Sequence, residues 1–144
     1  MPTVFEKLNL KGQNPILVLN APTSFEPELG ALLGVTIVRD LDSKQPLTFC
    51  LVFVQQQAEI VALAPQIAAR AQGDAVVWFA YPKGTSRRYT CNFNRDTGWG
   101  PLRAAGFETV RQIAIDEDWS ALRFRRLEFI KTLKRATNRP APSA

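Results

Sequence analysis

The chain has 144 residues, of which 46% are hydrophobic and 22% are charged, with a formal net charge of +5 and no histidine. This length suits one domain, and the composition is that of a globular protein with its own core. Without histidine, Ser–His and Cys–His nucleophile pairs are excluded. The two cysteines are too few for a zinc site, so we predict no metal centre.

The first 40 residues predict a strand, a short helix and a second strand. Residues 15–20, PILVLN, form an apolar run after a turn signal and predict a buried strand. Thr23 or Ser24 is expected to cap a short helix that Gly34 ends. The β-branched run at residues 35–40, VTIVRD, predicts the second strand.

The middle of the chain predicts a strand, a helix and another strand. Residues 47–54, LTFCLVFV, and residues 75–81, AVVWFAY, are apolar without alternation, as in strands that helices cover on both faces. Between them, residues 55–74 carry apolar side chains at a helical period. We expect Pro65 to kink or break this helix and Gly73 to close it.

A further helix and a hairpin are predicted next. Asp96 or Thr97 is expected to cap a helix that Gly106 stops. The strands at 109–115 and 119–126 are joined only by DED, which requires an antiparallel hairpin.

The C-terminal residues predict one more helix and a tail. Residues 127–136, LEFIKTLKRA, have apolar positions on one side, and residues 137–144 are expected to be a disordered tail. We therefore predict one α/β domain over residues 1–136. Because strands alternate with helices, the fold is expected to be a doubly wound, mostly parallel sheet, in which ligands bind outside the carboxyl ends of the strands.

The charge is distributed unevenly along the chain. Residues 1–82 hold five Lys/Arg and seven Asp/Glu, a net −2, whereas residues 83–144 hold thirteen and six, a net +7. A basic half can attract nucleic acid, phosphate compounds or anionic lipid, or it can be an ordinary solvated surface. No RNA-recognition or helix-turn-helix pattern is present, so nucleic acid is not the favoured partner. No signal peptide or membrane span is evident, and we expect a cytoplasmic protein without disulfides.

A cationic loop directly follows the strand at 75–81. The segment PKGTSRR contains Lys83, Arg87 and Arg88 together with a glycine and two hydroxyls. These three cations are the predicted anion-binding residues, since charge-assisted contacts and backbone donors suit a phosphate or a carboxylate. The alternative is a solvated loop.

Other polar or aromatic positions have a structural and a functional interpretation. Trp99 either lines a pocket or packs a helix on the sheet, and residues 116–118, DED, either hold a hard cation or face water. Arg95 is expected to pair with Asp116 or Asp118, and Trp119 to anchor the hairpin.

The second strand of the hairpin carries alternating side chains. In SALRFRR, Leu122 and Phe124 should lie on one face, with Arg123 and Arg125 on the other. Such an arginine ladder either contacts an anionic surface or protects an edge strand from aggregation.

The segments ILVLNAP, YPKGTSRRYTCNFNRDTGWGPLRAAGFE and VRQIAIDEDWSALRFRR resemble a bacterial domain-of-unknown-function family, over roughly residues 10–135. The core of that family is similar to the Rossmann-like fold of S-adenosylmethionine-dependent methyltransferases, which end in an antiparallel hairpin. The resemblance implies six strands in the order 2-1-3-4-6-5. It also implies that Asn20, after the first strand, and Asp40, where a ribose-binding acid would stand, are the cofactor-binding positions.

The chain departs from the methyltransferase pattern at two strand ends. The loop after the first strand is NAPTSFEP, without glycine and with two prolines, and QQQ follows the third strand instead of an Asn/Asp-Pro-Pro-aromatic motif. We therefore predict a methyltransferase-like domain without catalytic activity that binds an anionic ligand or a protein partner. The alternative is a methyltransferase with an atypical cofactor loop. The sequence identifies no cofactor and no oligomeric state.

Overall fold

A six-stranded sheet lies at the centre of the computed structural model, which describes residues 3–41, 46–93 and 97–130. The strands stand in the order β2-β1-β3-β4-β6-β5, as predicted. Their bounds are β1 Ile16–Leu19, β2 Ile37–Val38, β3 Leu47–Phe53, β4 Ala71–Pro82, β5 Phe107–Ala114 and β6 Trp119–Arg126. The first four strands are parallel, and β6 runs antiparallel to both β4 and β5. The predicted Rossmann-like α/β fold is therefore confirmed.

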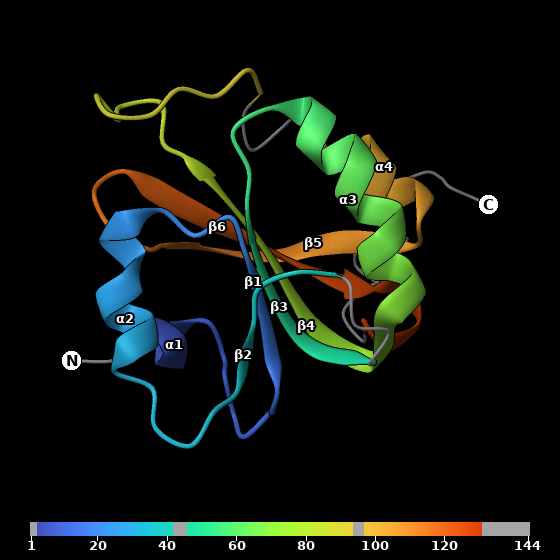
Figure 1. Cartoon of the computed structure of the whole chain (residues 1–144). Helices are drawn as coiled ribbons and strands as arrows, with labels where there is room; N and C mark the ends of the chain where they lie inside the picture. Colours follow the sequence, from blue (N-terminus) through green and yellow to red (C-terminus); the bar gives the residue numbers. More distant parts are fainter. Residues whose placement is uncertain (1–2, 42–45, 94–96, 131–144) are drawn as a thin grey trace.

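Short helices cover both faces of the sheet (Figure 1). On one face lie α1 and α2, the latter preceded by the 3₁₀ turn η1; on the other face lie α3 and α4. Their bounds are α1 Val4–Lys7, η1 Thr23–Phe25, α2 Glu26–Gly30, α3 Gln57–Arg70 and α4 Gly100–Ala104. The 3₁₀ turn η2, Leu127–Phe129, follows the last strand.

The two central strands explain why their sequences are apolar without alternation. In β3, Phe49 packs on the side of α1, whereas Cys50 packs on the side of α3, and both are fully buried. Each face of the strand therefore contributes to a core, as is typical of parallel strands with helices on both sides. Burial raises the pKa of the Cys50 thiol to about 12, since a thiolate would lose its hydration there.

The helix α3 differs from its prediction in two respects. It continues through Pro65 as one element and ends at Arg70, so of the kink or break predicted at Pro65 the break is wrong, as is the closure predicted at Gly73. Pro65 and Val61, whose carbonyl loses its helical partner, are both exposed, so water can solvate that carbonyl. Gly73 instead lies within β4 at a φ of 59°, where the register against β3 shifts. Glycine inside a strand commonly marks such an irregularity.

Four further helix ends also differ from their predictions. The N-cap of α2 is Phe25, and neither Thr23 nor Ser24 caps it. The helix α2 ends at Gly30 rather than Gly34, and Leu33 beyond it is 89% exposed, so no apolar face extends the helix. The N-cap of α4 is Trp99, not Thr97, and Asp96 lies outside the described residues. Residues 127–129 form the 3₁₀ turn η2 instead of beginning an α-helix. The rest of the predicted helix and the predicted tail lie outside the described residues.

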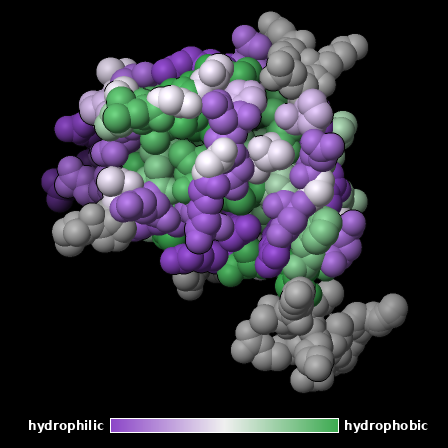
Figure 2. All heavy atoms as spheres, turned by 90° about the horizontal axis from the view of Figure 1, so that it is seen from below, coloured by the Kyte–Doolittle hydropathy of each residue, from purple (hydrophilic) through white to green (hydrophobic). Residues whose placement is uncertain are grey.

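The surface is mixed in character. Seen from below Figure 1, hydrophilic residues surround and separate patches of apolar ones (Figure 2). The exposed large apolar side chains among the described residues, Leu33, Val61, Val110 and Leu127, come from four different segments. Among the helices of the described part of the chain, none has both the length and the apolar character needed to cross a bilayer.

Candidate functional site

The carboxyl ends of the parallel strands meet at one edge of the sheet, where a ligand is expected. Because Leu17 of β1 pairs with Val38 of β2 and with Cys50 of β3, the register carries Asn20 and Asp40 to this same edge. The register of β4 against β3 brings the loop that begins at Lys83 there as well. Two of the predicted sites, the cofactor positions and the cationic loop, therefore share one edge of the sheet.

Two side chains of the loop after β1, those of Asn20 and Phe25, attach this loop to the sheet. Asn20 adopts a left-handed backbone conformation, with a φ of 61°, and its Nδ2 donates a hydrogen bond to the Phe53 carbonyl at 3.3 Å. Phe25, which is 2% exposed, packs its ring against that of Phe53 with centroids 5.0 Å apart. These contacts tie the loop to the carboxyl end of β3.

The acid expected to bind a ribose stands at the end of β2 in an exposed position. Asp40 is exposed and directly follows Arg39. The Arg39 guanidinium donates two hydrogen bonds to the Glu26 carboxylate, at 2.9 and 3.0 Å, and this pairing lowers the pKa of Glu26. The arginine beside Asp40 thus joins β2 to α2.

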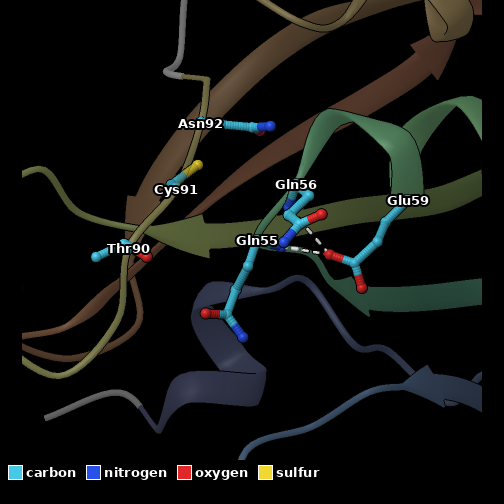
Figure 3. A pocket seen from close by; sticks show the side chains of 6 residues that line it. All are labelled: Gln55, Gln56, Glu59, Thr90, Cys91 and Asn92. Carbon is cyan, nitrogen blue, oxygen red and sulfur yellow. Dashed lines mark hydrogen bonds between the residues drawn. The ribbon is translucent and has the colours of Figure 1, made fainter.

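A cleft of about 490 Å³ opens between the start of α3 and the chain after β4 (Figure 3). Its lining residues are Gln55, Gln56, Glu59, Thr90, Cys91 and Asn92. The backbone N–H groups of Gln55 and Gln56 both donate to Oε1 of Glu59, at 2.7 and 3.0 Å. The N–H of Gln57 donates to Oδ1 of Asn92 at 2.8 Å. Backbone donors at a helix start can hold anions, but these three are used by the chain's own side chains.

The thiol in this cleft is poorly suited to nucleophilic chemistry. Desolvation is the largest influence on Cys91 and raises its pKa, and nearby Glu59 acts in the same direction. Its Sγ donates a hydrogen bond to the Phe93 carbonyl at 3.0 Å, and no histidine exists in the chain to act as its base. Since the thiolate is the reactive form, Cys91 is expected to be inert at neutral pH.

The cationic loop after β4 is a structured turn fastened to the hairpin. The Lys83 N–H donates to the Asp118 carbonyl at 2.8 Å, and the Ser86 hydroxyl donates to the Asp118 carboxylate at 2.9 Å. The Ser86 oxygen in turn accepts hydrogen bonds from the N–H groups of Arg88 and Tyr89, both at 3.2 Å. One serine and one aspartate thus fix the course of this loop.

The three predicted anion-binding cations occupy different positions in the loop. Lys83 is half-buried and lines a second cleft, of about 240 Å³, whose walls include Tyr81, Tyr89 and Thr90. Arg87 and Arg88 are exposed and do not line that cleft. Among the described residues, none of the three side chains pairs with a carboxylate, including those of the DED turn.

Several of the alternatives left open by the sequence are decided in favour of packing. Trp99 is fully buried against Tyr81 and Phe124 and is not a pocket wall. Trp119 is 2% exposed and contacts Phe53 edge-on at 5.1 Å, which confirms its anchoring role.

The DED turn also has a structural role. Oδ1 of Asp116 accepts hydrogen bonds from the N–H groups of Asp118 and Trp119, and no group of three metal-ligating side chains occurs in the described part of the chain. The pairing predicted for Arg95 lies outside the described residues.

Several solved structures with the same architecture are methyltransferases. An S-adenosylmethionine-dependent methyltransferase from Aquifex aeolicus matches 86% of this chain and 88% of its own, with a TM-score of 0.64 and 12% identity. The glycopeptide N-methyltransferase MtfA, complexed with S-adenosylmethionine, matches 85% and 91%, with a TM-score of 0.55 and 12% identity. The chain has a methyltransferase-like Rossmann fold.

The likeness extends to the fold and no further. The [4+2]-cyclase SpnF matches 85% of this chain and 78% of its own at a TM-score of 0.54 and 11% identity, so this architecture also serves a different reaction. No protein-family model and no curated protein matches the sequence. The methyltransferase-like core predicted from the resemblance is therefore supported by structure, whereas the more specific bacterial family stays a prediction.

Part of this edge of the sheet was not predicted from the sequence. The residues QQQ were expected at the end of β3, but their contact with Asn92, 35 positions further on, was not. The segment around Asn92 shows neither apolar periodicity nor a charge cluster, so no local signal places it beside α3.

Proposed function

We propose that this methyltransferase-like domain acts by binding an anionic ligand or a protein partner, without transferring a methyl group. The proposal depends chiefly on the loop after β1. In dinucleotide- and cofactor-binding Rossmann folds, glycines at this place let the backbone approach the ligand and offer it N–H donors. Here Asn20 occupies the left-handed position, and Pro22 has no N–H to donate.

The surroundings of this loop support the same proposal. Its end is fixed by the burial of Phe25 against Phe5 and Phe53, with ring centroids 5.7 and 5.0 Å apart. A different path of the backbone here would separate these rings. Each lost ring pair costs about 0.5–1.5 kcal/mol, in addition to the cost of exposing its apolar surface to water. The N–H groups of Gln55, Gln56 and Gln57 are satisfied by Glu59 and Asn92, so these three donors are not available to the ligand either.

The available side chains favour binding over catalysis. The larger cleft contains amides, a hydroxyl, one carboxylate and a thiol whose pKa is raised by burial. A general base with a pKa close to 7 is needed to activate such a thiol or hydroxyl, and the chain has no histidine to supply it.

The anionic ligand is proposed to bind at the cationic loop. Lys83 lines the smaller cleft beside the hydroxyl-bearing residues Ser86, Tyr89 and Thr90. Arg87 and Arg88 extend the positive charge onto the exposed part of the same loop. Because Ser86 and Asp118 already fix this turn, the ligand needs to order little of it, which favours affinity.

Methyl transfer is the second candidate, because the structure of MtfA contains S-adenosylmethionine and because Asp40 stands at the carboxyl edge of the sheet. Calorimetry of the full-length protein with S-adenosylmethionine and with S-adenosylhomocysteine separates the two candidates. We expect no saturable heat with either compound. A dissociation constant in the low micromolar range that Asp40→Ala weakens would replace the binding proposal by the enzymatic one.

A further inference from the structure

The hairpin formed by β5 and β6 gathers three arginines on one face of the sheet. Arg111 of β5 lies directly opposite Arg123 of β6, and side chains opposite each other in an antiparallel pair point to the same face. Arg125 lies two residues beyond Arg123 and therefore shares that face. This is the face that carries α1, because the neighbours of Arg123, namely Trp78 across the strand and Ala121 along it, pack with that helix.

A bulge in β5 creates this arrangement. Thr109 pairs with Phe124 and Arg111 pairs with Arg123, so β5 advances two residues where β6 advances one, and Val110 is the additional residue. In a regular pairing continued from Thr109, Val110 would lie opposite Arg123, and Arg111 would point to the opposite face of the sheet. Bulges occur frequently where a strand re-aims a side chain at a functional site.

The guanidinium groups of Arg111 and Arg123 have no hydrogen-bond partner among the described residues. Nε of Arg123 is buried and has no hydrogen-bond partner, whereas Arg125, two residues further on, is hydrogen-bonded to a carboxylate. Arg125 donates to both oxygens of Asp74, at 2.8 and 2.6 Å. Burial of Arg123, together with the nearby charges of Arg125 and Arg111, lowers its pKa, while Asp74 acts in the other direction.

The local charge does not balance. Glu108 lies opposite Arg125 in register, but its Oε2 accepts from Nε of Arg103 at 3.4 Å and from the N–H and hydroxyl of Thr109. Among the described residues, Asp74 is the carboxylate that pairs with this group of three arginines, which leaves two uncompensated positive charges. Like charges directly opposite each other destabilise a strand pair, so an anion between them would relieve a repulsion that the fold now carries.

We propose that Arg111, Arg123 and Arg125 form a binding site for the phosphate group of a small phosphate monoester. A monoester carries a charge of about −1.5 to −2 at neutral pH, which matches the two uncompensated charges. Guanidinium groups present planar pairs of donors that suit phosphate oxygens. Arg123 lies opposite Trp78, five residues along β4 from Lys83, or about 16 Å at the usual rise of a strand. The site is thus separate from the cationic loop and goes beyond the proposed function.

The test is a nuclear magnetic resonance titration of the full-length protein with inorganic phosphate and with glycerol 3-phosphate, at an ionic strength held constant with chloride. We expect saturable shifts of the Nε–H signals of Arg111 and Arg123 and of the adjoining amides. Both dianions should bind more tightly than dimethyl phosphate, which carries one charge. Shifts that rise linearly without saturation, or tighter binding of the diester, would overturn the proposal.

Matched variants assign the site. Arg123→Gln should weaken phosphate binding roughly tenfold to a hundredfold, as expected for the loss of hydrogen bonds to a charged group. Arg111→Gln should also weaken phosphate binding. Because Arg111 is exposed, this variant can test the site if Arg123→Gln does not fold. Arg39→Gln is the control, since that arginine follows β2 at the opposite edge of the sheet, and it should leave the affinity unchanged.

Two more variants separate this site from its surroundings. Asp74→Asn should raise the phosphate affinity, because it releases Arg125 from its carboxylate. Lys83→Ala should leave the hairpin shifts unaltered, so a failure of the cationic loop to bind is distinguishable from a failure of this site. Equal affinities for Arg111→Gln and Arg39→Gln would show that the three arginines do not hold the phosphate.

Discussion

The indole N–H of Trp78 donates a hydrogen bond to the carbonyl oxygen of Leu8 at 2.7 Å, with both residues fully buried. Trp78 lies within β4, and Leu8 is the C-cap of α1. This bond therefore joins the N-terminal helix to the central sheet. A carbonyl deprived of its partner in such a place costs the full penalty of its desolvation, about 1–3 kcal/mol.

We expect Trp78→Phe to lower the free energy of unfolding by roughly 2–4 kcal/mol, from the lost hydrogen bond and the lost volume together. Trp119→Phe is the matched control, because Trp119 is also buried but its Nε1 has no hydrogen-bond partner. The control should be less destabilising, since it removes volume and an unsatisfied donor. Urea unfolding measures both. Equal losses of stability would mean that the bond to Leu8 contributes nothing.

The sequence was most informative where strands are buried on both faces. The unbroken apolar runs of β3 and β4 could only be central parallel strands, and the three-residue connection between β5 and β6 could only be a hairpin. Helix ends were predicted poorly, because a glycine or proline limits local backbone geometry without indicating its tertiary surroundings. Gly73 was predicted to end a helix, but it lies inside β4, where the register against β3 shifts.

The Cys50 thiol should make stability depend on alkaline pH. Its pKa is raised from 9.0 to about 12 in the folded protein, so the unfolded chain releases this proton first as the pH rises. The native state then binds more protons than the unfolded state, and stability falls above about pH 9, by up to about 1.4 kcal/mol per pH unit from this group. Well below pH 9 the thiol is protonated in both states and adds nothing to the pH dependence of stability.

The measurement is the free energy of unfolding at several pH values between neutral and alkaline, for the protein and for Cys50→Ala. The variant loses packing at every pH but should show a shallower alkaline slope than the parent, since tyrosine and lysine titrate equally in both. Parallel curves would contradict the buried, protonated thiol.

The candidate site was predicted from sequence only in part. The strand-end rule brought Lys83, Asn20 and Asp40 to one edge of the sheet, because parallel strands end together. The contact of Glu59 and Asn92 with the start of α3 could not be predicted, because it depends on where the chain returns after β4. The bulge that places Arg111 opposite Arg123 could not be predicted either, because no residue in TVRQIAI marks where an additional residue enters the strand.

Glu59→Gln should weaken the start of α3. The Glu59 carboxylate accepts hydrogen bonds from two backbone N–H groups and lies in the first turn, where the helix dipole favours a negative charge. We expect the free energy of unfolding to fall by about 1 kcal/mol, and hydrogen exchange of the Gln55 and Gln56 amides to accelerate. Glu28→Gln in α2 is the control; its carboxylate has no such partners among the described residues, and a loss as large would show that charge alone explains the effect.

Lys83 is a predicted anion-binding cation that lines a described cleft. Lys83→Ala should remove phosphate-induced shifts from the amides of residues 84–90 while stability changes by no more than about 0.5 kcal/mol, because the loop is held by Ser86 and Asp118 rather than by the lysine side chain. Binding should also weaken as salt is added, since the loop is exposed to solvent. Lys11→Ala, at an exposed position before β1, is the control for the loss of one positive charge. If the phosphate-induced shifts of residues 84–90 persist in Lys83→Ala as they do in Lys11→Ala, then the loop is a structural turn, and its cations serve only to keep the surface solvated.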